Sequence, residues 1–265
     1  MSGITSPSLT PPTAVQWAAQ ADLVLLTVEM LRPPVVGRES NQPPAWTGLS
    51  RGELNELLSA AGLPDSTVRE GTTLQPKTTL REALHEVFVA GQALEREAWV
   101  DEYWRLFDSS MACPITEAAY VRRDKGAILG DAAGFYAAFG WQHDPRRGER
   151  PDHLLCQLEF VAALLAMASR AGDAEQRQVT AAALADFARD HLHDWLPSFA
   201  WQLCEGSQLQ YFGAVAAWLV MLWDALSARH NWPADKRATE PLTPQVETEN
   251  PYECAANGLV QIGEH

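Results

Sequence analysis

The sequence lacks the cysteine patterns of disulfide scaffolds and zinc sites. Its 265 residues hold only four cysteines, namely Cys113, Cys156, Cys204 and Cys254. They are widely spaced and form no Cys-x-x-Cys pair, whereas zinc sites and small secreted domains need close or dense cysteines. We therefore expect reduced thiols in a cytosolic protein.

Export and membrane signals are missing as well. Residues 1–13 are rich in Ser, Thr and Pro, and they lack the basic start and apolar core of a secretory signal. The stretch that comes nearest to a membrane span, residues 211–223, is too short to cross a bilayer as a helix. We expect the protein to remain in the cytoplasm.

The commonest motifs of phosphate and dinucleotide binding are absent. Lys125-Gly126 runs in the opposite order to the Gly-Lys-Ser/Thr end of a phosphate loop. Gly-x-Gly-x-x-Gly does not occur. Two common classes of nucleotide-binding site are thereby excluded.

Positive charge is scarce. The chain has 20 Lys and Arg against 34 Asp and Glu, which gives a formal net charge of −14. This balance argues against nucleic acid or an anionic membrane as the main partner. It favours cationic or apolar partners, although an acidic surface also serves solubility.

Apolar residues are plentiful and recur at helical spacing. They make up 46% of the chain, with ten Trp, and no β-hairpin signal, βαβ alternation or internal repeat is present. We expect an all-α, single-domain globule of roughly eight to ten helices with no sheet. Helix signals cover residues 14–31, 50–62, 79–107 with a break near Gly91, 124–139, 151–171, 174–190 and the stretch that follows a capping Ser207.

The domain organisation follows from these signals. Residues 1–13 are expected to form a flexible tail, residues 14–228 the helical domain and residues 229–265 an irregular tail rich in Pro and charge. The polar residues 140–150 are either a hinge between two helical halves or an ordinary exposed loop. Two parts of the last tail are apolar enough to dock back on the body, Tyr252-Glu253-Cys254 and Leu259-Val260-Gln261-Ile262.

The stretch Glu149–Phe160 opens the central helix. Pro151 suits the first helical position, and Asp152 in the first turn complements the helix dipole. At helical spacing, Asp152 and Glu159 share a small, apolar face. The opposite stripe consists of Leu154, Leu158, Val161, Ala162 and Leu165. The two acids are either a first-turn acid and a surface charge, or parts of a binding site.

A metal site would need four scattered side chains to converge. They are His153, Glu159, His191 and His193, and a small all-helical metalloenzyme built on them is the competing hypothesis. Asp152 and Glu159 would lie about 10.5 Å apart along one helix axis, too far to share an ion directly. No His-x-x-x-His pair occurs either, and we expect no metal.

Three blocks of residues carry a resemblance to a known family. Glu149-Arg150-Pro151-Asp152-His153-Leu154, followed by Leu158-Glu159-Phe160, resembles the Glu-x-Pro-Asp-His-Leu…Glu-Leu-Glu-Phe signature of the TorD/DmsD/NarJ family of redox-enzyme maturation chaperones. Gln157 stands where that pattern often has an acid. The other two blocks are similar to further family segments: Phe187, His191-Leu192, Trp195, Pro197 and Phe199; and Cys113-Pro114 with Glu117–Tyr120, then Ala133-Gly134-Phe135-Tyr136 and Phe139-Gly140.

The resemblance, which covers about residues 80–228, implies an all-α chaperone with no catalysis and no cofactor of its own. The implied partner is the molybdopterin-containing catalytic subunit of a dimethyl sulfoxide reductase superfamily enzyme. The chaperone would hold its twin-arginine leader, or the corresponding N-terminal segment, until the cofactor is inserted. An acidic protein with apolar grooves complements paired arginines beside an apolar stretch.

The resemblance also implies roles for single residues. Asp152 and Glu159 would face cationic client residues, and His153 would fix the hinge. The full implied client-binding set is Glu149, Pro151, Asp152, His153, Glu159, His191, Trp195, Pro197 and Phe199. A monomer and a domain-swapped dimer both stay open. Some relatives are reported to bind guanine nucleotides, which the missing phosphate loop puts in doubt here.

Overall fold

The computed structural model describes residues 10–34, 45–65, 78–109, 112–142, 149–233 and 240–245. Within these ranges the chain forms ten α-helices, and its only β pairing is an isolated bridge between Thr116 and His153. The expected all-α fold is confirmed. The helices are α1 (Ala14–Leu31), α2 (Arg51–Ala61), α3 (Leu80–Gln92), α4 (Arg96–Trp104), α5 (Glu117–Tyr120), α6 (Lys125–Ala138), α7 (Leu154–Arg170), α8 (Ala174–His191), α9 (Leu196–Gly206) and α10 (Gln210–His230). A 3-10 turn (Ala45–Gly48) precedes α2 and a π turn (Arg105–Ser109) follows α4.

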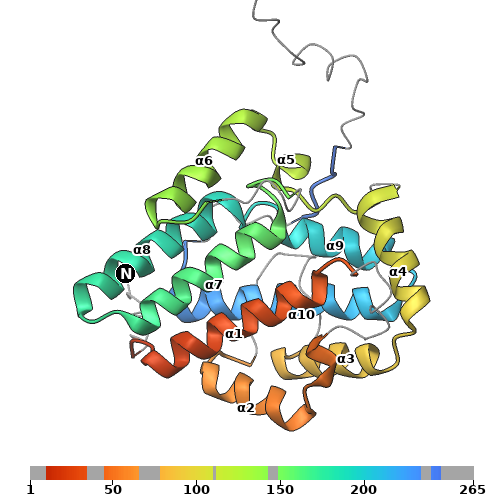
Figure 1. Cartoon of the computed structure of the whole chain (residues 1–265), viewed down its shortest axis with the longest axis horizontal. Coiled ribbons are helices and arrows are strands. Elements are labelled where there is room, and N and C mark those ends of the chain that lie inside the picture. The colour runs from red at the N-terminus through yellow and green to blue at the C-terminus, as the bar shows by residue number, and fades with distance from the viewer. Residues whose placement is uncertain are drawn as a thin grey trace, which may run out of the picture.

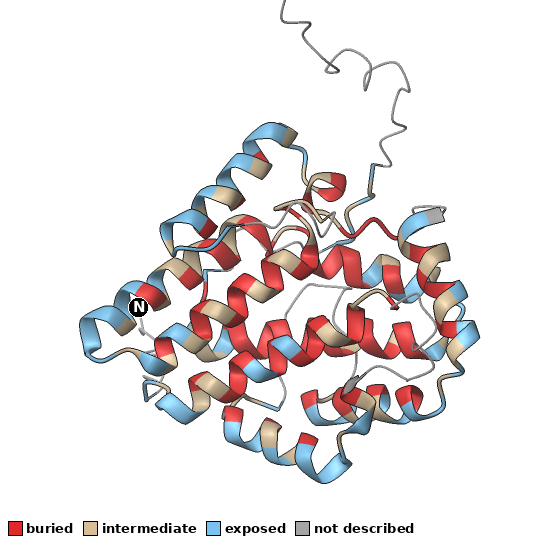
Figure 2. Ribbon diagram, in the orientation of Figure 1, coloured by how far each residue is buried: buried red, intermediate tan, exposed pale blue. Residues whose placement is uncertain are grey.

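The core lies where α1, α7 and α10 cross. Figure 1 shows α1 and α7 side by side in front of α10, with α2 and α3 along the lower edge. Helix α8 packs on α7, and α9 packs on α10. Buried residues are concentrated on α7, α9 and α10 in Figure 2. The predicted stripe of α7, from Leu154 to Leu165, lies inside this core.

Helix α10 is longer than the apolar stretch that the sequence suggested. By length and composition alone its 21 residues would suffice to cross a membrane, yet 83% of its most apolar window is buried inside the bundle. The core helix of a globular protein has the same properties. Trp218 illustrates how α10 is held inside the bundle, because its indole N–H donates to Thr27 Oγ1 of α1 at 2.8 Å.

Capping residues set several helix ends as the sequence predicts. Ser50 and Glu53 form a capping box at the start of α2, and Gly62 ends that helix in the left-handed region at φ 60°. Thr79 and Glu82 form a second box at the start of α3. Local side-chain chemistry decides these boundaries, and for this reason they can be predicted without tertiary information.

Two sequence expectations about helix ends are wrong, and one helix was not predicted. Helix α7 begins at Leu154 with His153 as its N-cap, so Pro151 and Asp152 lie in the preceding turn and Asp152 is not on the helix face of Glu159. Helix α9 was not predicted from the sequence, and Pro197 occupies its first turn. Ser207 is the C-cap of α9, and α10 begins after Leu209 without a side-chain cap.

Gly91 lies inside helix α3. A close contact with a neighbouring side chain, rather than a bend in the helix, explains why this position is a glycine. Helix α3 continues through it to Gln92, and a β-carbon at Gly91 would overlap the indole of the buried Trp46. We expect Gly91→Ala to lower the free energy of unfolding by about 1–3 kcal/mol, measured by urea unfolding. Gly134 of α6 is exposed with open space around it, so Gly134→Ala is the control and should raise stability by about 0.5–1 kcal/mol. Equal effects at the two positions would refute the close-contact explanation.

His230, the last residue of α10, is enclosed by aromatic rings. Its ring centroid lies 4.3 Å from that of Trp17 and 5.6 Å from that of Trp232, and its Nε2 lies 2.7 Å from Gln20 Oε1. Burial, together with the charge of Arg229, lowers the pKa of His230 from 6.5 to about 3. Between these two pKa values, His230 is therefore neutral in the folded protein and protonated in the unfolded chain.

This depressed pKa predicts a pH dependence of stability. Between the two pKa values the unfolded chain binds the extra proton, so the free energy of unfolding should fall by about 1 kcal/mol for each pH unit below 6.5. Chemical unfolding at several pH values measures this slope. His230→Gln removes the titrating group and should flatten the slope. An NMR titration that places the His230 pKa near 6.5 would contradict the assignment.

Parts of the expected domain scheme lie outside the described residues. These parts are residues 143–148 of the expected hinge, most of the two tails, and both apolar segments between Tyr252 and Ile262. At the N-terminal edge, the Thr10 carbonyl accepts a bond from Arg229 and Thr13 caps α1. After α10, residues 240–245 lie against α5 and α9.

Candidate functional site

The family-like blocks meet where α5 approaches the start of α7. Thr116 forms the isolated bridge with His153, and the Glu117 N–H donates to the Asp152 carbonyl at 3.0 Å. The Leu154 N–H donates to the Ile115 carbonyl, also at 3.0 Å. Backbone pairing therefore fixes the short helix α5 to the turn that carries the Pro-Asp-His sequence.

The Asp152 carboxylate is completely buried and paired. Its two oxygens accept bonds from the Arg150 guanidinium at 2.9 and 2.7 Å, and Oδ2 also accepts from the Ala118 N–H at 3.2 Å. An arginine held by both of its branches fixes the geometry of a carboxylate firmly. Asp152 thus ties its own turn to α5.

A second buried carboxylate, that of Glu117, contacts three other side chains. Its Oε2 accepts a bond from Gln157 Nε2 at 2.7 Å and lies 3.0 Å from His191 Nδ1. Its Oε1 lies 3.4 Å from an Arg123 nitrogen. Burial raises the pKa of Glu117, while the bonds from His191 and Gln157 act in the opposite direction. One side chain from each of α5, α7 and α8 meets here.

Aromatic side chains enclose the two carboxylates. The Tyr136 hydroxyl donates to the Pro151 carbonyl at 2.7 Å, and burial raises the pKa of Tyr136 well above its ordinary value. The Tyr120 ring stacks on Trp195 with ring centroids 5.5 Å apart. The Trp195 indole N–H donates to the His191 carbonyl at 2.6 Å. We use the name signature cluster for two sets of side chains together. The polar set is Glu117, Arg150, Asp152, Gln157 and His191, and the aromatic set is Tyr120, Tyr136 and Trp195.

The structure divides the predicted client-binding residues into two groups. Five are buried: Asp152, His191, Trp195, Pro197 and Phe199. Four are partly exposed: Glu149, Pro151, His153 and Glu159. The buried five belong to the signature cluster and the adjoining core, so in this conformation a client would meet only the partly exposed four directly.

Of the two partly exposed acids, Glu159 lies on α7 and Glu149 lies in the segment before this helix. The Glu159 side chain is 27% exposed and pairs with Arg32 of α1 at 3.2 Å. Glu149 Oε2 accepts from the Cys156 thiol at 3.6 Å. The two carboxylates thus flank the Cys156 side of α7 and stay within reach of solvent.

The residues of the metalloenzyme hypothesis are not brought together as a metal site. His191 lies at Glu117, whereas His193 is buried and its Nδ1 accepts from the Trp223 indole at 3.0 Å. Glu159 pairs with Arg32, and the His153 Nδ1 accepts from the Leu155 N–H. Across the described part of the chain, no group of three or more His, Cys, Asp or Glu has the arrangement of a metal site.

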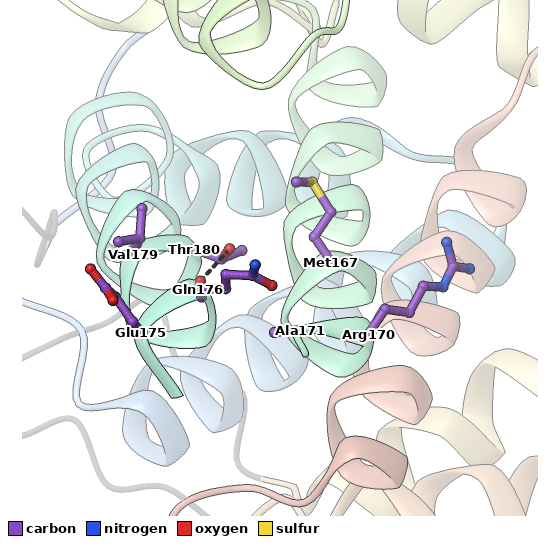
Figure 3. A pocket seen from close by; sticks show the side chains of 7 residues that line it. All are labelled: Met167, Arg170, Ala171, Glu175, Gln176, Val179 and Thr180. Atoms are coloured by element: carbon purple, nitrogen blue, oxygen red, sulfur yellow. Dashed lines mark hydrogen bonds between the residues drawn. The ribbon is translucent and has the colours of Figure 1, made fainter. Parts of the chain in front are cut away.

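A separate hollow of about 480 Å³ lies between α7 and α8. Figure 3 shows Met167 on α7 opposite Gln176 and Thr180 on α8. Met167 is 13 residues from Leu154, about 20 Å along the helix at 1.5 Å per residue. The hollow is therefore at the far end of α7 from the signature cluster, and none of the predicted site residues lines it.

The central place of Glu117 and its contacts with Arg123 and Gln157 were not predicted, and neither was the pairing of Arg150 with Asp152. The available signal was the Cys-Pro…Glu-x-x-Tyr block, in which Glu117 stands. Spacing offered no further help, since Glu117 is 40 residues from Gln157 and 74 from His191.

Comparisons with known proteins agree with the motif blocks. The sequence profile of a family described as "Nitrate reductase delta subunit" matches residues 73–200. Proteins named "Chaperone protein TorD" from strains of Vibrio cholerae serotype O1 are 33% and 34% identical over 103 residues. That match covers 37% of this chain and 46% of each relative, so the chain spans about half the length of these curated relatives. The profile, the relatives and the helical fold all agree with the signature blocks, and within residues 73–200 the chain is similar to the TorD/DmsD/NarJ family.

Proposed function

We propose that this protein is a cytoplasmic chaperone that binds the catalytic subunit of a molybdopterin-dependent oxidoreductase. It would hold the subunit's leader or N-terminal segment until the cofactor is inserted and the enzyme is assembled, and it would catalyse no reaction itself. The observation that carries the proposal is the signature cluster, in which residues from three family blocks, Glu117, Asp152 and His191, join in one buried network. The relatives named as chaperones support it.

The division into buried and exposed residues suggests two roles. We assign Glu149 and Glu159 to contact with cationic client residues, because their carboxylates reach solvent on a chain with a formal charge of −14. We assign Asp152 and His153 to positioning, because they fix α5 and the start of α7. His191, Trp195, Pro197 and Phe199 support that arrangement from the interior.

The proposal is tested by capture from the native cytoplasm. The tagged full-length chain is expected to retain a large molybdopterin-dependent subunit that mass spectrometry identifies, and the retained form should lack its cofactor. A chain with Glu117→Ala, in which the cluster is broken, is the matched control and should retain much less. If the folded wild-type chain captures no such subunit, the proposal fails.

The two roles predict different binding behaviour for two variants. Glu149→Gln with Glu159→Gln should weaken binding of a labelled twin-arginine leader peptide about fivefold and flatten its salt dependence, because exposed ion pairs are weak and screened. Asp152→Asn should also weaken binding, yet leave the salt dependence unchanged, since Asp152 acts through α5. Fluorescence anisotropy at two salt concentrations measures both effects. A flattened salt dependence with Asp152→Asn would instead assign Asp152 to direct contact.

A further inference from the structure

An extended segment of the chain, Glu240–Gln245, lies across the outer side of α5 and α9. It is the blue stretch that rises beside α5 in Figure 1. Three hydrogen bonds join its backbone to the body: from the Leu242 N–H to Ser198 Oγ (2.9 Å), from the Gln245 N–H to the Ala119 carbonyl (2.7 Å), and from Arg122 to the Thr243 carbonyl (3.2 Å). The body therefore holds this segment through its main chain.

The side chains of the segment alternate in burial. Leu242 and Pro244 are partly buried, and Leu242 packs against the hydrophobic core. Pro241, Thr243 and Gln245 point to solvent and are exposed. Main-chain hydrogen bonds with alternate side chains facing inward are the features by which proteins bind extended peptides.

The groups beneath the segment are suited to peptide binding. Helix α5 has only four residues, so its last carbonyls need partners from outside the helix, and the Ala119 carbonyl receives one from Gln245. The Ser198 side chain is fully buried, yet its hydroxyl oxygen accepts from the segment. All three hydrogen bonds between the body and the segment use main-chain atoms of the segment. The site therefore suits other extended sequences with an apolar residue at the Leu242 position.

The signature cluster fixes one wall of this site. Asp152 accepts from the Ala118 N–H, and His153 pairs with Thr116 directly before α5. The Ala119 carbonyl follows within the same four-residue helix. A change at Asp152 would therefore alter the peptide site without any contact between Asp152 and a peptide.

We propose that the groove between α5 and the start of α9 is the binding site for an extended client segment, and that Glu240–Gln245 is a built-in occupant which the client displaces. The assignment of the occupant to a client rests on the proposed function. A suitable client segment is extended, with an apolar residue at the Leu242 position and Pro or a second apolar residue two positions later.

The test uses full-length variants of the segment itself. Leu242→Asp places a charge at the partly buried position and should release the segment, whereas Thr243→Ala changes an exposed side chain and is the matched control. A labelled synthetic peptide with the sequence of residues 238–247 is added to each protein. We expect Leu242→Asp to bind it at least tenfold more tightly than either the wild type or Thr243→Ala. Absence of binding to Leu242→Asp would overturn the peptide site.

A twin-arginine leader peptide of a molybdopterin-dependent subunit distinguishes this proposal from the proposed function. If the leader also binds Leu242→Asp several-fold more tightly than the wild type, it uses this groove. Equal leader affinity for both proteins would overturn the groove as the client site while leaving the chaperone function intact. If the leader binds neither protein but the 238–247 peptide binds Leu242→Asp, the peptide site stands and the chaperone function fails.

Discussion

Replacing Glu117 by alanine is expected to lower the free energy of unfolding by about 3–5 kcal/mol, because breaking a buried ionic network leaves its other members without partners. His191 Nδ1 and Gln157 Nε2 would both lose their acceptor in the interior, and Arg123 would lose its buried partner. The loss also removes the side-chain bonds that join α5 to α7 and α8. Urea unfolding followed by circular dichroism measures the effect.

Two controls identify the cause of that loss. Glu117→Gln keeps the shape and one acceptor, so it should cost about half as much. Asp131 lies 3.6 Å from His191 and 3.8 Å from Arg123, but its side chain is 50% exposed. Asp131→Ala should therefore cost less than about 1 kcal/mol. A Glu117→Ala protein as stable as Asp131→Ala would show that the network contributes little.

Replacing Trp195 by alanine is expected to cost about 3–5 kcal/mol, the usual range for a buried Trp. The indole is completely buried, stacks on Tyr120 and packs edge-to-face against Phe199 at 6.0 Å between ring centroids. Its N–H also satisfies the His191 carbonyl at the end of α8. The substitution would leave a cavity and an unpaired carbonyl in one place.

Trp201 provides the matched control for this substitution, since it lies in the same helix, α9, and is 39% exposed. Trp201→Ala should cost less than about 1 kcal/mol. Thermal unfolding of the two variants beside the wild type makes the comparison. Similar losses for both would mean that the Trp195 contacts do not contribute as the geometry indicates.

The sequence predicts the fold well where local chemistry decides it. The capping boxes at Ser50 and Thr79 and the left-handed Gly62 mark helix ends through residues three or four positions apart. The start of α7 was predicted wrongly because Pro151 fits a first helical turn equally well. Tertiary bonds hold both residues in a turn instead, because Ala118 of α5 donates to Asp152 and Tyr136 of α6 donates to the Pro151 carbonyl.

The site was harder to predict than the fold. The motif blocks identify the right residues, but periodicity places Asp152 on the helix face that it would share with Glu159, whereas its side chain is buried by Arg150 and α5. The buried contacts of Glu117 are with Gln157 and His191, which are 40 and 74 positions away along the sequence. The docking of the segment after α10 was not predicted, because main-chain bonds hold most of it and Leu242 is the one side chain of the segment that packs against the core.

Calorimetric titration of the folded wild-type chain with a twin-arginine leader peptide, at low and at moderate salt, tests the central claim that this protein holds another polypeptide. We expect saturable binding with micromolar or better affinity, which weakens as salt screens the acidic side chains. No heat of binding at either salt concentration, with leaders from several molybdopterin-dependent subunits, would contradict it.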